Sequence, residues 1–257
     1  MSSRLINRWI VRRQINEAAK LRMFCFPYAG GSATIYNDWY KYSHNIEVCA
    51  IQYPGHGNRL LETPINNLST LVKKIKEVIR CYLDKPFVFF GHSLGALVAY
   101  ELTRELRREN KQCPEILFIS AFRAPHLPFK RNELHKLPDN DLLESLRQMN
   151  GTPEVILRDQ EMMDLMLPMI RADLEVSETY SYVQEHPLNI PITVFGGIED
   201  SSIAYEALEA WGMHTDQRFR LISFRGDHFF LHNNGEHMFK VINEDIAPLI
   251  MKDNKIH

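Results

Sequence analysis

The feature that most constrains the fold is the pentapeptide Gly91-His92-Ser93-Leu94-Gly95, which stands between two segments of different periodicity. The apolar run Pro86–Phe90 before it is typical of a buried strand, and after it apolar residues recur at helical spacing. A turn of this type, joining a strand directly to a helix, holds its serine in a strained backbone with the hydroxyl exposed at the helix N-terminus. Gly91 and Gly95 let the strand and helix approach closely. We therefore expect Ser93 to be a nucleophile and not a simple helix cap.

The rest of the chain repeats this alternation of short apolar runs with amphipathic segments. The 257 residues fit one domain, 1–257. Helical patterns cover Leu68–Ile79, Leu94–Leu106 and Met238–Ile250, and six runs have the length and bulky content of strands buried on both faces: Met23–Phe26, Ile46–Tyr53, Phe87–Phe90, Ile116–Phe122, Ile192–Phe195 and Phe219–Phe224. This order predicts an α/β protein with a mostly parallel central sheet flanked by helices. Together with the serine turn it indicates the α/β-hydrolase fold.

One long insertion interrupts the alternation. About seventy residues separate Phe122 from Ile192, and they contain helical patterns at Leu142–Met149 and Met162–Ser177. This is more than a crossover between consecutive strands requires. We expect residues 130–187, approximately, to form a helical cap over the carboxyl ends of the strands, where sheets of this kind bind ligands.

A serine hydroxyl needs a base, and chain order in this fold places the base after a late strand. Gly226-Asp227-His228 directly follows the run Phe219–Phe224, so His228 is the predicted base. His232 and His237 lie nearby and raise the alternative of a zinc site. No HExxH motif or suitably spaced third ligand is present, and we expect both histidines at the surface and no metal.

The acid that orients His228 should follow an earlier strand. After Phe122 no acidic residue occurs until Glu133, whereas the run ending at Phe195 is followed at once by Gly196-Gly197-Ile198-Glu199-Asp200. The glycine-rich turn favours Asp200 as the acid. Glu199 remains the alternative, because neighbouring loop residues point in different directions.

The oxyanion hole of this fold takes one N–H from the residue after the nucleophile, here Leu94. The second N–H comes from the loop after an early strand, Phe26–Gly31 in this chain. Pro27 has no N–H, which leaves Tyr28 or Ala29 as the donor. The glycine pair of this loop does not indicate a nucleotide site, because neither G-x-G-x-x-G nor G-x-x-x-x-G-K-[ST] occurs, and we expect no cofactor.

Composition excludes several other classes. A net charge of −2 gives no reason to expect nucleic acid as a partner, and the apolar runs are too short to span a membrane. The N-terminus has Arg4, Arg8, Arg12 and Arg13 before its first acidic residue, but no secretory segment follows, and we interpret it as an exposed leader before a short edge strand at Trp9–Val11. The four cysteines, Cys25, Cys49, Cys81 and Cys113, include no CxxC pair. Three of them lie in or beside apolar stretches, and we interpret these as small buried hydrophobes in a reducing, cytoplasmic compartment.

Taken together, four motifs resemble the external (type II) thioesterases, stand-alone enzymes that accompany nonribosomal peptide and polyketide synthases: Phe24–Ala33, Gln52–Gly57, Gly91–Gly95 and Gly226–Leu231. The resemblance extends over nearly the whole chain. It implies hydrolysis of acyl or aminoacyl groups from the phosphopantetheine arm of a carrier protein, with the Ser93, Asp200 and His228 triad and the second oxyanion donor at Ala29. His56 departs from the family, which more often has arginine or another polar residue there, and the basic leader is longer than usual.

Two alternatives remain at this point. An acyl-CoA thioesterase or a carboxylesterase would use the same fold and triad, and an inactive binding module is the remote alternative, although all three triad positions are filled. For a carrier protein, whose recognition helix is acidic, we expect a compact basic patch on an otherwise monomeric enzyme. The segment after Phe122 provides candidates: Arg123, Lys130, Arg131 and Lys136.

Overall fold

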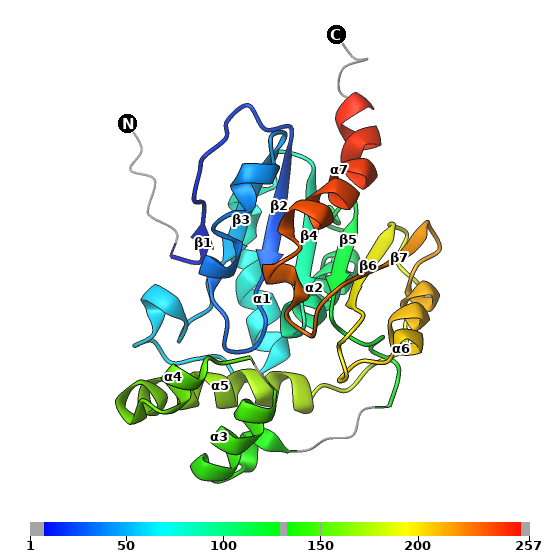
Figure 1. Cartoon of the computed structure of the whole chain (residues 1–257). Coiled ribbons are helices and arrows are strands. Elements are labelled where there is room, and N and C mark those ends of the chain that lie inside the picture. The colour runs from blue at the N-terminus through cyan, green and yellow to red at the C-terminus, as the bar shows by residue number, and fades with distance from the viewer. Residues whose placement is uncertain (1–7, 129–132, 150, 253–257) are drawn as a thin grey trace.

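The computed structural model describes residues 8–128, 133–149 and 151–252, and its strands form one sheet (Figure 1). The spatial order is β1-β3-β2-β4-β5-β6-β7, and all neighbouring strands run parallel except the antiparallel edge strand β1. The strands are β1 (Ile10–Val11), β2 (Leu21–Phe26), β3 (Ile46–Ile51), β4 (Phe87–His92), β5 (Leu117–Ser120), β6 (Ile192–Gly197) and β7 (Phe219–Phe224). The predicted mostly parallel sheet and its short N-terminal edge strand are confirmed.

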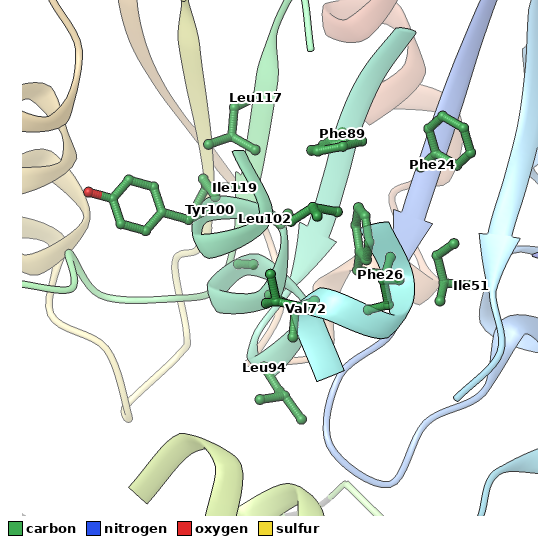
Figure 2. Packing of buried hydrophobic residues seen from close by; sticks show 14 of the residues in the cluster. Phe24, Phe26, Ile51, Val72, Phe89, Leu94, Tyr100, Leu102, Leu117 and Ile119 are labelled. Carbon is green, nitrogen blue, oxygen red and sulfur yellow. The ribbon is translucent and has the colours of Figure 1, made fainter. Parts of the chain in front are cut away.

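Side chains alternate between the two faces of the sheet, as the pleat of a strand requires. On one face Phe24, Phe26 and Phe89 make edge-to-face ring contacts and pack, with Val72 and Leu102, under α1 (Leu68–Ile79) and α2 (Leu94–Arg108), as Figure 2 shows. On the other face, side chains of the intervening residues pack against α7 (Gly235–Lys252): Met23, Cys25, Val88, Phe90 and Phe118. Helices therefore cover both faces of the sheet. A ligand site is expected at the carboxyl ends of the strands.

The chain between β5 and β6 forms its own helical layer. It contains α3 (Asp139–Gln148), α4 (Glu154–Leu157) and α5 (Gln160–Glu178), which share a hydrophobic cluster that includes Leu142, Met163 and Leu167. In Figure 1 these helices lie beyond the arrowheads of the central strands. The helix α6 (Tyr205–Glu209) and short 3-10 helices complete the structure: η1 (Ala33–Tyr36), η2 (Trp39–Tyr42), η3 (Gly57–Arg59), η4 (Arg80–Tyr82), η5 (Leu134–Lys136), η6 (Ala210–His214) and η7 (Phe230–His232).

The structure differs from the predicted strands in two respects. Residues of β7 are mostly half-buried, because this strand lies at an edge of the sheet, so the prediction of burial on both faces was wrong for it. The predicted strand Ile116–Phe122 ends at Ser120, since Ala121 has φ 49° and leaves the extended conformation. Within residues 8–252, as far as they are described, no helix has the length and apolar character to cross a membrane.

Candidate active site

The serine of the pentapeptide lies in the turn between β4 and α2, in a conformation that few side chains adopt. Ser93 has φ 52° and ψ −119°, and its N–H donates to the Ser120 carbonyl oxygen at 2.8 Å. A Cβ atom on Gly91 would lie 2.1 Å from the carbonyl oxygen of Gly95, and one on Gly95 would lie 2.0 Å from that of Phe26. The predicted strained turn is confirmed, and tight backbone packing on both sides maintains it.

Three side chains that follow parallel strands form one hydrogen-bonded chain. The Ser93 hydroxyl lies 3.0 Å from Nε2 of His228, and Nδ1 of His228 lies 2.7 Å from Oδ2 of Asp200. They follow β4, β7 and β6, whose carboxyl ends meet at the same edge of the sheet. The Asp200 side chain is 4% exposed, whereas Glu199 is an exposed residue whose N–H donates to the Gly226 carbonyl. The structure therefore brings Asp200, and not Glu199, onto His228.

Asp200 has a second partner that the sequence did not single out. The hydroxyl and the N–H of Ser202 donate to Oδ1 of Asp200 at 2.5 and 2.9 Å, so both carboxylate oxygens accept hydrogen bonds. Burial alone would raise the pKa of Asp200, but the hydrogen bonds and charge of His228, with those of Ser202, lower it below its ordinary value. An acidic residue followed two positions later by serine is a common turn motif, and this spacing was the available signal.

The loop after β2 lies against the start of α2, since a Cβ atom on Gly95 would also lie 2.7 Å from the Pro27 carbonyl oxygen. In this corner the N–H groups of Tyr28, Ala29 and Leu94 have no hydrogen-bond partner among the residues described. Unpaired N–H groups beside a nucleophile can hold a negatively charged oxygen. The two predicted oxyanion donors therefore lie on adjoining segments and are available to a ligand.

His92, inside the pentapeptide, has a structural partner on each side of its ring. Its Nδ1 lies 2.8 Å from the Ser120 hydroxyl and its Nε2 lies 2.9 Å from the main-chain oxygen of His228. The sequence alone assigned His92 no role. Its contact with His228 depends on how β4 and the loop after β7 lie in space. It connects the backbone of His228 to the centre of the sheet.

The two other histidines near His228 do not join the hydrogen-bonded chain. His232 and His237 are both exposed, as predicted, and Nε2 of His232 lies 3.0 Å from the Tyr28 hydroxyl. Across the described part of the chain no three histidine, cysteine or acidic side chains are arranged to hold a metal ion.

The helices between β5 and β6 approach this site from the carboxyl ends of the strands (Figure 1). The side chain of Ile170 in α5 would lie 3.6 Å from a Cβ atom on Gly30, in the loop that carries Ala29. Between α3 and α4, a Cβ atom on Gly151 would lie 2.6 Å from the ring of Phe229, which directly follows His228. Both loops of the site are therefore in contact with the segment between β5 and β6.

Of the basic patch predicted after Phe122, Arg123 and Lys136 belong to the described residues. Arg123 is half-buried and donates to the Leu127 carbonyl at 2.6 Å, so its guanidinium holds a local turn. Lys136 pairs with Glu133 at 2.6 Å. Lys130 and Arg131 lie outside the described residues. The docking role of this segment stays a prediction.

A mostly parallel sheet with this serine turn at its centre defines the class: the chain is an α/β-hydrolase. It belongs to the thioesterase domain family, whose sequence model matches residues 21–246, and it is a thioester-hydrolysing enzyme.

Relatives that are named for a biosynthetic pathway are similar to this chain over nearly its full length. The gramicidin S biosynthesis protein GrsT of Aneurinibacillus migulanus is 42% identical over 250 residues, which cover 95% of this chain and 98% of the relative. The solved structure of the type II thioesterase BorB from the borrelidin biosynthetic cluster is 33% identical with a TM-score of 0.84, covering 92% of this chain and 96% of that one. The structure of ClbQ from the colibactin NRPS/PKS pathway is 30% identical with a TM-score of 0.85, covering 91% and 99%. The resemblance predicted from the motifs is confirmed.

Proposed function

We propose that this enzyme releases acyl or aminoacyl groups from the phosphopantetheine arm of carrier proteins during nonribosomal peptide or polyketide synthesis. The observation that carries the proposal is the hydrogen-bonded chain Ser93–His228–Asp200, set beside the N–H groups of Ala29 and Leu94 in a thioesterase. The names of the relatives, which refer to gramicidin S, borrelidin and colibactin, support the substrate class.

In the first half of the reaction, Ser93 Oγ attacks the thioester carbonyl carbon while Nε2 of His228 takes the hydroxyl proton. Asp200 orients the ring and stabilises the imidazolium. The oxyanion that forms accepts hydrogen bonds from the Ala29 and Leu94 N–H groups, each worth about 3–4 kcal/mol in sites of this type. The carbon–sulfur bond then breaks, and His228 returns the proton to the departing sulfur, which leaves as the pantetheine thiol. A thiol, with a pKa of about 8.5, leaves readily.

In the second half, water hydrolyses the acyl group held on Ser93. His228 takes a proton from the water as its oxygen attacks the ester carbonyl, and the same N–H groups hold the second oxyanion. Collapse of this intermediate breaks the bond to Ser93 Oγ, and His228 protonates that oxygen. The products are the free acid and the original enzyme, so no cofactor is consumed.

We also assign residues 130–187 the role of a cap within the single domain 1–257. The contacts of Ile170 with the Gly30 loop and of Gly151 with Phe229 support this, because they bring the inserted segment to the loop that carries Ala29 and to the residue after His228. A cap excludes water from the acyl group and shapes the space that the acyl chain enters. We further propose a monomer that works in the cytoplasm, in keeping with its four unpaired cysteines.

Comparison of three substrates with one acyl group tests the function. The enzyme should hydrolyse an acyl-carrier protein with a kcat/KM at least about tenfold above those for the acyl-CoA and the nitrophenyl ester, since docking adds binding energy. Ser93→Ala, the control, should abolish all three activities and labelling by a fluorophosphonate. Equal or faster turnover of the acyl-CoA would favour an acyl-CoA thioesterase. Preference for the nitrophenyl ester would favour a carboxylesterase, and an unlabelled, inactive wild-type protein would favour a binding module.

A further inference from the structure

A buried carboxylate in α5 connects the proposed cap to the loop of the oxyanion hole. Asp173 is 2% exposed, and its Oδ2 atom accepts two hydrogen bonds. One comes from the backbone N–H of Gly30 at 2.7 Å and the other from Nε2 of His56 at 2.8 Å. The three residues belong to segments that are far apart in the sequence: α5, the loop after β2 and the loop after β3. One side chain therefore holds two loops of the fold together.

Each ring nitrogen of His56 faces an oxygen atom. Its Nδ1 lies 2.9 Å from the Pro54 carbonyl oxygen, which only accepts, and its Nε2 faces the Asp173 carboxylate. With Asp173 as a carboxylate, both ring nitrogens carry a proton. Burial and the charge of Arg59 lower the pKa of His56, but the charge and hydrogen bond of Asp173 and the Pro54 carbonyl outweigh them and raise it. His56 is 1% exposed, so the charge of Asp173 is balanced inside the protein and not by solvent.

The hydrogen bond to Gly30 fixes the peptide next to Ala29. The N–H of Gly31 donates to the Tyr28 carbonyl oxygen at 2.9 Å, and Gly30, the third residue of this turn, has φ +75°. Without a further restraint, the Ala29–Gly30 peptide is free to rotate between alternative turn geometries. The acceptor on Asp173 selects one of them. The same hydrogen bond anchors the backbone directly after Ala29, the residue whose N–H is the proposed oxyanion donor.

We propose that Asp173 is a positioning residue for the oxyanion hole, which holds the Ala29–Gly30 turn in its catalytic geometry with His56 as its buried counter-ion. The inference rests on the proposed function, because it takes Ala29 as an oxyanion donor. It adds that a helix of the cap is part of the support of the catalytic machinery, and not only a cover for the acyl group.

The same helix provides a matched control. Glu178, near the end of α5, is also a buried carboxylate that accepts backbone N–H groups and pairs with a histidine: it accepts from Leu134 at 3.0 Å and from His135, whose Nδ1 lies 2.5 Å away. Its partners belong to η5, not to the oxyanion loop. Removal of either carboxylate disturbs the packing of α5, but only Asp173 contacts Gly30.

The experiment compares Asp173→Ala with Glu178→Ala, using an acyl-carrier protein and a nitrophenyl ester as substrates. For Asp173→Ala we expect kcat to fall about 10- to 100-fold with little change in KM, which is part of the loss seen when an oxyanion donor is removed. The affinity for a trifluoromethyl ketone, which binds Ser93 as an oxyanion, should fall by the same factor. Both substrates should lose the same factor, and Glu178→Ala should change kcat less than about threefold.

Three results would overturn the inference: unchanged kcat in Asp173→Ala, an equal loss in Glu178→Ala, or a loss confined to KM. If Asp173→Ala does not fold, as judged by its thermal transition, His56→Gln replaces it. This variant should show the same kcat-specific loss to a smaller extent, since glutamine donates to Asp173 but not also to Pro54. Failure of the proposed function has a different signature, because the wild-type enzyme would then prefer another substrate while the effect of Asp173 on the nitrophenyl ester persists.

Discussion

Nε2 of His92 lies 2.9 Å from the main-chain oxygen of His228, so the residue before the nucleophile holds the backbone of the proposed base. Burial, followed by the nearby charge of His228, lowers the pKa of His92 well below its ordinary value. The ring is therefore neutral at physiological pH. Its Nε2–H donates to His228, and its Nδ1 accepts the Ser120 hydroxyl at 2.8 Å. The contact fixes the distance between β4 and the loop after β7.

This contact predicts that His92→Ala impairs catalysis as well as stability. Loss of the ring leaves the His228 carbonyl and the Ser120 hydroxyl without their partner, at a cost of about 1–3 kcal/mol in the free energy of unfolding. The backbone of His228 also loses its support, and we expect kcat to fall about tenfold or more. Urea unfolding and steady-state kinetics measure the two effects. Ser120→Ala is the control, because it removes the hydroxyl that contacts His92 but leaves the contact of His92 with His228. It should lower the free energy of unfolding with a smaller change in kcat. Equal kcat in His92→Ala and wild type would contradict the prediction.

The proposed triad could be predicted because each member closely follows a strand that the sequence reveals. Ser93, Asp200 and His228 need only the chain order and the convergence of parallel strands at one edge. Asp173 had no such signal. It lies in the helical insertion, whose position on the sheet depends on side-chain packing and not on strand order, and its partner Gly30 is 143 positions away. Helical periodicity predicts that α5 exists but not what it touches.

The choice between the two neighbouring acids can be tested directly. Asp200→Asn should lower kcat by about 10³- to 10⁴-fold, because an amide cannot hold His228 in the tautomer that accepts the serine proton. Glu199→Gln is the matched control and should retain nearly full activity, since Glu199 is exposed and only its backbone contacts the loop after β7. Steady-state kinetics on a nitrophenyl ester measures both. A severe loss in Glu199→Gln with a benign Asp200→Asn would reverse the assignment.

The second glycine of the pentapeptide should tolerate no side chain. In Gly95→Ala the new Cβ atom would lie 2.0 Å from the Phe26 carbonyl oxygen, and because this neighbour is backbone, α2 must move. We expect a loss of about 3 kcal/mol or more in the free energy of unfolding, measured in urea, together with loss of activity. Gly235→Ala is the control: its nearest neighbour would be a Tyr42 ring carbon at 3.5 Å, an ordinary contact. Equal stability of the two variants would contradict the argument.

A histidine pair that contacts Tyr100 of α2 was also beyond prediction from the sequence. Nδ1 of His126, after β5, lies 2.7 Å from Nε2 of His214 at the end of η6, and the Tyr100 hydroxyl lies 2.8 Å from the other nitrogen of His214. Burial, then the charges of His126 and Arg104, lower the pKa of His214 from 6.5 to about 4. Eleven histidines occur in the chain, and nothing in their spacing marks this one as buried.

The depressed pKa of His214 predicts a specific loss of stability in acid. The unfolded chain binds this proton from pH 6.5 downward, whereas the folded protein resists it until about pH 4, so stability falls as the pH drops through this window. At pH 5 the contribution is about 2 kcal/mol. His214→Gln does not titrate, and its amide oxygen can still accept the Tyr100 hydroxyl. Relative to wild type, the variant should therefore gain about 2 kcal/mol between pH 7.5 and pH 5, whatever it loses at pH 7.5. Urea unfolding at both pH values measures this difference, and a constant gap between the two proteins would show that His214 does not carry the acid sensitivity.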